Sequence, residues 1–580
     1  MTARRLPAPL HPAARPGEPV SLRWHGRRIA GHAGEPLAVA LLAAGEAGIS
    51  RSFRVHRPRG LMCSTGQCGW CECEVDGRPS LRSCRVPVRD GLRARSEHGV
   101  PDGRRDVLGL VDHVWRLLPP SFYHHRFLRP RQLRKRYLDV LRFFAGRGRL
   151  RAGPRSLPWR DALEREVDVL VVGGGCAGLL AAEAAAESGA SVLLLEAEFE
   201  PAAICRWRTP PLPDGRRLEA LAASIAARVE LRTGATLLGL YDEGGVAVAG
   251  DVLLTVHARA TVVATGSYER LPPVPGIDRP GVIGARTVEW LLGAFGVLPG
   301  EEALLVGEAD DCAGAEAALI AAGARVVARV TGEQLLAVEG GDRARAVRCF
   351  VEGNERWADV DLVVVGDRAA SVEAAIAAGL DLEADGRGGI VPHSGRDGST
   401  AVPGLFLAGA AAGRPIDSPA AVEAARTAGR AAAALAGTTS ATRAARGPAP
   451  RDGSRAAGAA ERLTPASVVH GLQRTSPADE AILCFCEDVR GAELRADQAV
   501  GYGLLELLKR RTGALTGPCQ GKYCLPAVLA ACAGAAATVG AEDGAATVGT
   551  DDEVTTLPTG RPPLRPVRLG DLAGPRSRAR

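Results

Sequence analysis

The sequence lacks long apolar runs, a strong net charge and an apolar signal segment, and each absence excludes a class of protein. No stretch of about 18 apolar residues runs without glycine or a charged residue, so we expect no membrane span. The formal net charge is only +6 over 580 residues, which gives no reason to expect nucleic acid as a partner. The N-terminal segment has arginines but no apolar h-region, so we expect a cytoplasmic protein. The eleven histidines are scattered, and no Ser/His/Asp arrangement suggests a catalytic triad.

Cysteine, by contrast, is abundant, with 14 residues in the chain. In a large cytoplasmic protein, cysteines are more often metal ligands or catalytic groups than disulfides. Eight of them form two compact groups of four, namely Cys63, Cys68, Cys71 and Cys84, and then Cys484, Cys486, Cys519 and Cys524. This grouping indicates two metal centres.

The composition changes several times along the chain, which is long enough for three or four domains. Short apolar strands alternate with Ala-rich helices in the long central part, as in a doubly wound α/β fold. Residues 126–155 have eleven Lys or Arg and one acid, but their apolar residues recur at helical spacing, which favours a packed helix over a nucleic-acid surface. The predicted division is a small domain at 18–95, a basic helical connector at 105–165, the α/β domain at 166–436, a flexible linker at 437–467, a Cys-bearing module at 470–535 and a tail at 536–580.

The first cysteine group has the plant-type [2Fe–2S] spacing, C-x4-C-x2-C followed by a distant Cys84. Four thiolates must converge on two irons, and the loop CSTGQCGWC can wrap a cluster while its backbone N–H groups point at the sulfurs. The hairpin and helix that precede it follow the β-grasp order of a plant-type ferredoxin. Structural zinc is the alternative, although zinc sites favour paired C-x2–4-C knuckles, which this group lacks.

The α/β domain begins with a glycine-rich turn between a strand and a helix. The turn contains Gly173, Gly175 and Gly178, and the following strand ends at Glu196, 18 residues after Gly178. Such glycines let the backbone approach a pyrophosphate, whose charge lies against the helix N-terminus. An acid at the position of Glu196 can bind a ribose hydroxyl. The order of strand, turn, helix, strand and acid predicts a dinucleotide site.

Two further segments favour FAD as this dinucleotide. Thr265 and Gly266 form a turn after the strand in TVVATGSYERLPPVPGID. GLFLAGAAAG, followed by a helix, resembles the motif that closes around the flavin ribityl chain in flavoproteins with two dinucleotide domains, and Gly409 is its backbone site. Many such proteins have Asp after this glycine, whereas this chain has Ala410, which weakens the ribityl contact. NAD and ATP remain alternatives to FAD.

A second nucleotide fold at 301–327 keeps the strand, turn, helix and strand but has lost most of its glycines. Its glycine positions read Gly307, Ala309 and Cys312. Acids at this turn would repel a pyrophosphate, so we expect a mainly structural region without NAD. These acids are Glu308, Asp310 and Asp311.

The second cysteine group has the pattern C-x-C-x32-C-x4-C, in AILCFCEDV and TGALTGPCQGKYC. It resembles the [2Fe–2S] module of bacterioferritin-associated ferredoxin, in which a C-x-C pair and a later C-x2–4-C pair together bind one cluster. Zinc is the alternative here too.

With these motifs, nearly all of residues 18–573 resemble the alpha subunits of the heteromeric sarcosine oxidase, opine oxidase, hydrogen cyanide synthase and proline/hydroxyproline dehydrogenase group. The resemblance is carried by RSFRVHRPRGLMCSTGQCGWC, VVGGGCAG, ATGSYERLPPVPG, GPCQGKYC and RPPLRPVRLGDLA. The long sarcosine oxidase alpha subunits have a C-terminal folate-related domain, which this sequence lacks.

The resemblance implies an α/β protein with a β-grasp ferredoxin-like domain, a Rossmann-like flavoprotein core with two dinucleotide-binding folds and a small Cys-rich helical module. It further implies FAD, two [2Fe–2S] clusters and, in some members, one wall of an FMN site at the partner interface. C–N oxidation would occur on a beta subunit related to D-amino-acid oxidase, with quinone or oxygen as electron acceptor. The alternatives are a self-contained NAD(P)H-dependent ferredoxin-type reductase and an electron-transfer scaffold without catalysis.

Overall fold

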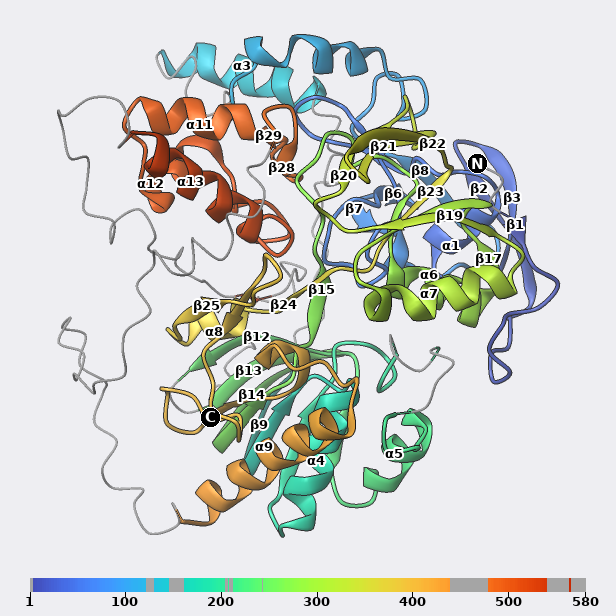
Figure 1. The fold of residues 1–580 in the computed structure, drawn as a ribbon. Coiled ribbons are helices and arrows are strands. Elements are labelled where there is room, and N and C mark those ends of the chain that lie inside the picture. Colours follow the sequence, from blue (N-terminus) through green and yellow to red (C-terminus); the bar gives the residue numbers. More distant parts are fainter. Residues whose placement is uncertain are drawn as a thin grey trace.

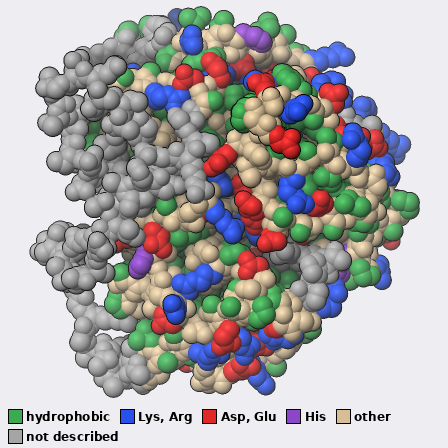
Figure 2. Space-filling model, viewed as in Figure 1, with side chains coloured by type: hydrophobic (Ala, Val, Ile, Leu, Met, Phe, Trp, Pro, Cys, Tyr) green, Lys and Arg blue, Asp and Glu red, His purple; other side chains and the backbone are tan. Residues whose placement is uncertain are grey.

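The fold is taken from a computed structural model of the chain, which describes residues 4–121, 130–144, 161–203, 207, 212–241, 244–438, 478–539 and 563–564. The N-terminal sheet and the second nucleotide fold lie beside each other, and the first nucleotide fold forms a separate layer below them (Figure 1). Basic and acidic side chains are interspersed over the visible face, as expected from the small net charge (Figure 2).

The N-terminal part is a small mixed sheet with one helix. Its elements are β2 Pro19–Trp24, β3 Arg27–His32, α1 Leu37–Ala43, β4 Ser50–Arg51, β5 Pro58–Arg59, β6 Glu72–Val75, β7 Arg78–Arg82, η1 Ser83–Arg85 and β8 Arg93–Ser96. The sheet order is β3-β2-β8-β6-β7, in which only β2 and β8 pair in parallel. Leu22, Trp24 and the apolar face of α1 form its core. The predicted hairpin (β2 and β3) and helix (α1) are both present.

The first nucleotide fold is built on a seven-stranded sheet. Its elements are β9 Asp161–Val172, α4 Cys176–Glu187, β10 Val192–Leu195, α5 Leu218–Ile225, β11 Glu230–Arg232, β12 Ala235–Tyr241, β13 Gly244–Ala249, β14 Val252–Val263, β27 Leu405–Leu407, η3 Gly409–Ala412 and α9 Pro419–Thr438. The order is β11-β10-β9-β14-β13-β12, with β27 added in parallel to β14. Figure 1 shows α4 and α9 side by side. They approach closely because Gly429 has no Cβ, which would overlap the carbonyl oxygen of Ala181.

The second nucleotide fold has a four-stranded parallel sheet in the order β16-β23-β18-β19. The elements of this part are β15 Ser267–Glu269, β16 Val282–Gly284, α6 Ala285–Phe295, β17 Val297–Leu298, β18 Glu302–Val306, α7 Ala309–Ala321, β19 Arg325–Val330, β20 Leu335–Glu339, β21 Ala346–Val351, β22 Asn354–Asp359, β23 Leu362–Val365, β24 Arg368–Ala370, α8 Glu373–Ala377, β25 Leu382–Ala384 and β26 Ile390–Pro392. β1 (Arg4–Arg5) pairs with β17. The predicted strand, turn, helix and strand are present as β18, α7 and β19.

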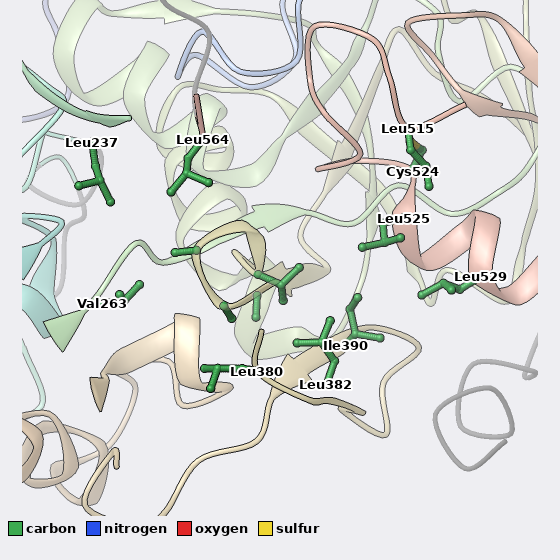
Figure 3. Packing of buried hydrophobic residues seen from close by; sticks show 14 of the residues in the cluster. Leu237, Val263, Leu380, Leu382, Ile390, Leu515, Cys524, Leu525, Leu529 and Leu564 are labelled. Atoms are coloured by element: carbon green, nitrogen blue, oxygen red, sulfur yellow. The ribbon is translucent and has the colours of Figure 1, made fainter. Parts of the chain in front are cut away.

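The C-terminal module consists of a short hairpin and three helices, and two helical segments of the connector lie nearby (Figure 1). These elements are β28 Ile482–Cys484, β29 Val489–Arg490, α11 Gly491–Ala499, α12 Leu505–Thr512, α13 Leu525–Val539, η2 Val107–Leu117 and α3 Arg131–Phe144. The module shares one apolar cluster with the first nucleotide fold, to which Leu237, Leu515, Leu525 and Leu564 belong (Figure 3).

The predicted boundaries differ from the structure at three points. The sequence predicts a helical connector up to residue 165, but β9 begins at Asp161, because residues 161–167 pair with Val252–Ala258 of β14. The polar alternation of DALEREV conceals this strand extension. Helix α13 continues to Val539, past the expected start of the tail at 536. Of the predicted linker 437–467, only the last two residues of α9 lie in the described part of the chain.

Candidate functional site

The predicted dinucleotide turn is closed by glycines that leave no room for side chains. Gly173 has φ +107°, and a Cβ there would overlap the carbonyl oxygen of Ala264. A Cβ at Gly178 would overlap the carbonyl oxygen of Gly173. These two glycines therefore let the turn pack against the start of α4 and the end of β14.

Gly175 differs, because it faces open space at the N-terminus of α4. A Cβ at this position would meet no atom of the described residues within 4 Å. Gly175 is the N-cap of α4, and no side chain caps the helix. The first amides of a helix lack partners within the helix, so this end suits an anionic group such as a pyrophosphate.

A pocket opens beside this turn, with a volume of about 1110 Å³ that includes its solvent-facing part. Gly173, Gly175, Glu196, Thr265 and Gly266 all line it. Within the described residues, the buried Oγ1 of Thr265 has no hydrogen-bond partner, so a ligand with a polar group fits this wall. The predicted residues of the turn, the second strand and the Thr-Gly segment thus converge on one pocket.

Glu196 lies in the pocket but is also engaged by the backbone. One of its carboxylate oxygens accepts from the amide of Gly174 at 2.6 Å, and the other accepts from the amide of Glu198 at 2.7 Å. A ribose hydroxyl bound here would donate to a Glu196 carboxylate oxygen that already accepts a hydrogen bond from a backbone amide. The ribose contact of Glu196 therefore stays a prediction.

Gly409 packs against helix α4 rather than in the pocket wall. It has φ +67°, and a Cβ there would overlap the Cβ of Ala177. The first residue of η3, shortly after the C-terminal end of β27, thus approaches the first turn of α4, next to the pocket. Its proposed contact with a ribityl chain stays a prediction.

The first cysteine group is buried and arranged as two pairs. All four sulfurs are free of disulfides, and Cys63, Cys68, Cys71 and Cys84 are each at most 3% exposed. Cys63 is hydrogen-bonded to Cys68, and Cys71 to Cys84. Burial raises the pKa of Cys63, but hydrogen bonds from Cys68, Thr65 and the loop backbone outweigh it and lower this pKa to about 5. The amide of Cys68 points at the sulfur of Cys63 at 3.4 Å.

The second cysteine group is assembled from the hairpin and the segment before α13. Cys486 is hydrogen-bonded to Cys519, and Cys524 to Cys484 and Cys519. Hydrogen bonds from Cys486 and Cys524 hold the pKa of Cys519 well below its usual value, against the effect of burial. Three of the four cysteines are buried, and Cys486 is half-buried. Among the described residues, no three or more His, Cys, Asp or Glu side chains are arranged to hold a single metal ion.

The two cysteine groups lie next to each other, which their separation of about 400 residues in the sequence conceals. The rings of Trp70 and Phe485 meet edge to face with centroids 5.1 Å apart. Tyr523 packs in the same apolar cluster as Cys63, Cys68 and Cys519. Burial, and then the neighbouring thiols of Cys63 and Cys68, raise the pKa of Tyr523 well above its usual value.

The loop of the first cysteine group also forms a wall of the pocket. Thr65 and Gln67, which lie between Cys63 and Cys68, line the pocket together with Gly175. The first cysteine group is therefore adjacent both to the pocket and to the second cysteine group.

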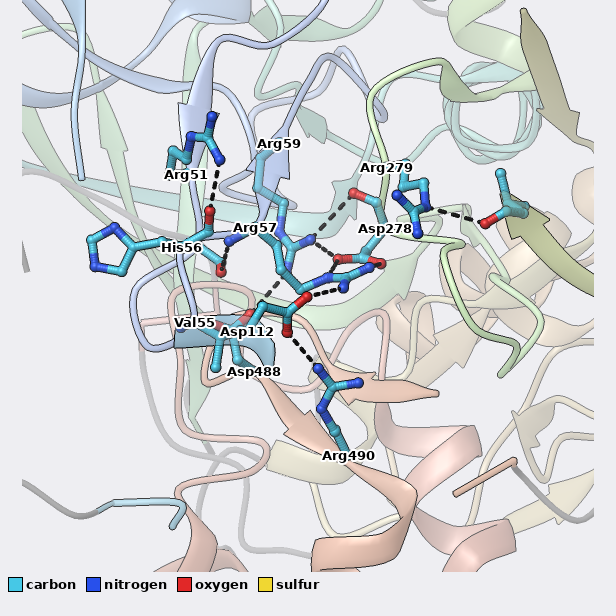
Figure 4. A network of polar contacts seen from close by, with 12 residues as sticks. Arg51, Val55, His56, Arg57, Arg59, Asp112, Asp278, Arg279, Asp488 and Arg490 are labelled. Carbon is cyan, nitrogen blue, oxygen red and sulfur yellow. Dashed lines mark hydrogen bonds and ion pairs between the residues drawn. The ribbon is translucent and has the colours of Figure 1, made fainter. Parts of the chain in front are cut away.

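A network of buried ion pairs holds this arrangement together (Figure 4). Asp278 accepts from Arg57 at 2.7 and 2.8 Å, and it also pairs with Arg59. Arg59 in turn donates to Asp488 at 2.8 Å. Asp112 accepts from Arg57 and, at 2.5 Å, from Arg490. Sequence reasoning missed these residues, because ion pairs between residues hundreds of positions apart leave no local pattern.

The acidic turn of the second nucleotide fold is internally paired. Asp311, at the start of α7, forms ion pairs with Arg368 and Arg387. Burial raises the pKa of the nearby Asp367. Carboxylates therefore lie at this turn, where they would disfavour a pyrophosphate. The loss of dinucleotide binding there stays a prediction.

The comparisons with known proteins match the predicted ferredoxin-like domain and the first part of the predicted nucleotide-binding domain. Residues 17–99 match the family described as 2Fe-2S iron-sulfur cluster binding domain, and residues 167–289 match the pyridine nucleotide-disulphide oxidoreductase family. The chain is 29% identical over 431 residues to the alpha subunit of sarcosine oxidase from Rhizobium meliloti, which covers 67% of this chain and 40% of that protein. It is 27% identical over 475 residues to an opine oxidase subunit of Agrobacterium tumefaciens, which covers 70% of this chain and 91% of that protein. The chain is thus similar to these oxidase subunits over about two thirds of its length.

These matches support an FAD-dependent oxidoreductase with a [2Fe–2S] cluster. The chain spans only 40% of the sarcosine oxidase relative but nearly the whole opine oxidase relative. Among solved structures, L-proline dehydrogenase from P. horikoshii aligns over 98% of this chain and 99% of its own, with a TM-score of 0.67 and 20% identity, and so has the same fold. No described helix is long and apolar enough to cross a membrane.

Proposed function

We propose that the chain is the electron-transferring subunit of a heteromeric FAD and iron–sulfur oxidase or dehydrogenase that acts on an amine, imino acid or opine. The observation that carries this proposal is the shared loop: Thr65 and Gln67 wall the pocket, while the flanking Cys63 and Cys68 belong to the first cysteine group. A flavin in the pocket would lie beside a cluster in that loop. A substrate oxidised on a partner subunit could deliver its electrons to this path.

FAD would be held by Gly173, Gly175 and Gly178 at the turn, by Glu196, and by Thr265 and Gly266 in the segment that packs beside the turn. When bound, FAD accepts two electrons and the iron–sulfur centres pass them on singly. The residues of the chain bind and orient the cofactor: the open end of α4 receives the pyrophosphate, and Thr265 offers a buried hydroxyl. Gly409 would approach the ribityl chain from η3.

Two [2Fe–2S] clusters are proposed, one in each cysteine group. Each iron of such a cluster takes two thiolates, so sulfurs gathered as pairs suit two irons better than one zinc ion. Cys63 with Cys68 and Cys71 with Cys84 form such pairs, and the second group contains the pairs Cys486–Cys519 and Cys484–Cys524. The contact of Trp70 with Phe485 would bring the clusters into electronic reach.

The partner is proposed to be a beta subunit related to D-amino-acid oxidase, because the relatives are named as subunits of sarcosine and opine oxidases. An FMN at the interface and a quinone or oxygen as acceptor are part of the same proposal, as is a cytoplasmic location. The alternative of a self-contained NAD(P)H-dependent reductase is less favoured, since Asp311, paired with Arg368 and Arg387, places a carboxylate at the second nucleotide turn.

Co-expression with such a partner tests the proposal. The chain alone should not oxidise sarcosine, proline or an opine, whereas the complex should reduce a dye or quinone with one of these substrates. Dye reduction driven by NADH in the isolated chain would favour the reductase instead. Absence of activity in the purified complex with every such substrate would refute the substrate class.

A further inference from the structure

Lys522 is a buried lysine in the loop between Cys519 and Cys524, and the proposed electron path does not use it. Its side chain is 0% exposed, and its Nζ donates to the carbonyl oxygen of Leu564 at 2.9 Å. Nζ also lies 3.7 Å from a carboxylate oxygen of Glu373. An ammonium group is costly to bury unless it is paired and hydrogen-bonded, so these two partners account for its position. Both partners line the dinucleotide pocket.

Leu564 reaches this pocket from the far end of the chain. Its amide donates to the carbonyl oxygen of Leu238 in β12 at 2.9 Å, and its carbonyl oxygen accepts from Lys522. It is 7% exposed and packs in the same apolar cluster as Leu237 and Leu525 (Figure 3). One backbone group of Leu564 is thus tied to the nucleotide fold, and the other is tied to the cysteine loop.

Glu373 connects Lys522 to the polar part of the same pocket wall. Its carboxylate accepts from the hydroxyl of Tyr268 at 3.0 Å and from the hydroxyl of Ser371 at 2.8 Å. Tyr268 and Ser371 both line the pocket. The Lys522 ammonium group therefore contacts an apolar and a polar section of one wall.

We propose that Lys522 is a positioning residue that fixes this wall to the second cysteine group, so that metal loading of the cysteine loop strengthens dinucleotide binding. The inference rests on the proposed function, which supplies both cofactors. Cys519 and Cys524 flank Lys522, so a metal centre bound by both restrains the segment that carries the ammonium group. An ordered Lys522 holds Leu564 and Glu373 in the positions that the ligand contacts. By linkage, a bound dinucleotide strengthens metal retention by the same factor.

The test compares FAD affinity in full-length variants purified with their metal. Lys522→Met keeps the length of the side chain and loses the ammonium group. Titration of FAD into the flavin-free protein, followed by flavin fluorescence, should give a Kd at least about tenfold higher than in wild type, while the iron content stays the same. Lys509→Met is the matched control, since Lys509 lies in the same module and pairs with Glu506 of its own helix, away from the pocket lining. Its Kd should be unchanged.

Two further variants separate the steps of the proposal. Leu564→Ala removes an apolar part of the wall and should weaken FAD binding severalfold without loss of iron. Cys519→Ser should weaken FAD binding by a factor similar to that of Lys522→Met. An FAD Kd equal to wild type in all three variants would overturn the proposal. Wild-type protein that binds no FAD would instead refute the proposed function, so the two failures are distinguishable.

Discussion

Replacement of Asp488 should loosen the attachment of the C-terminal module to the N-terminal sheet. Asp488 is 0% exposed, accepts from Arg59 at 2.8 Å, and accepts from the amides of Arg54 and Val55 at 2.9 and 3.2 Å. Breaking a buried ion pair by removing one partner costs about 3–5 kcal/mol, and each orphaned donor adds about 1–3 kcal/mol. Because Arg59 keeps Asp278 as a partner, the ion-pair loss is small and the two orphaned amides dominate, so we expect Asp488→Ala to cost about 4 kcal/mol.

Hydrogen exchange of the segment around Arg54 and Val55 measures this cost directly, since Asp488 protects both amides. A loss of about 4 kcal/mol corresponds to roughly a thousandfold faster exchange when opening is at equilibrium. Asp488→Asn keeps an oxygen acceptor and should show an intermediate effect. Asp479→Ala is the control, because Asp479 pairs with Arg495 at the surface and should contribute less than about 1 kcal/mol. Equal exchange in the Asp488→Ala and Asp479→Ala proteins would refute the reasoning.

Two further outcomes are expected. Gly175→Val should leave the protein folded, because a Cβ at this position meets no atom within 4 Å. Heat denaturation of this variant should release no FAD, because the valine side chain fills the space of the pyrophosphate. Stoichiometric FAD in this variant would contradict the proposed site. Burial raises the pKa of Asp278, but Arg57 and Arg59 outweigh it and hold the pKa well below the usual value of about 3.9. A lowered folded pKa means that this carboxylate stabilises the fold above about pH 4 and that the stabilisation is lost as the pH falls further. The thermal midpoint should therefore fall on acidification, and less steeply in Asp278→Asn; identical slopes would contradict the assignment.

The parts of the site that depend on local geometry could be predicted from the sequence. The turn at Gly173 and Gly178 needs glycine wherever it occurs, since a Cβ would strike neighbouring backbone. The spacing of Cys63, Cys68 and Cys71 likewise reflects a single loop. Such patterns can be recognised within about ten residues of the sequence.

The contacts between distant segments could not be predicted. Nothing near Lys522 in the sequence indicates Leu564 or Glu373, and nothing near Trp70 indicates Phe485, because these neighbours are created by the fold. The start of β9 at Asp161 was missed for a related reason. Its first residues alternate in exposure and gain their strand structure from pairing with β14.

The central claim is that one electron path runs through two separate [2Fe–2S] clusters, and stepwise anaerobic reduction followed by EPR tests it most directly. Wild-type protein should contain about four irons and four labile sulfides and give two distinguishable signals, since the two cysteine groups differ in hydrogen bonding and exposure. Cys68→Ser should remove one signal and spare the other, and Cys519→Ser should do the reverse. Stoichiometric zinc without iron in the second group would mean that the second metal centre is structural and carries no electrons. Absence of iron from both groups would contradict the claim.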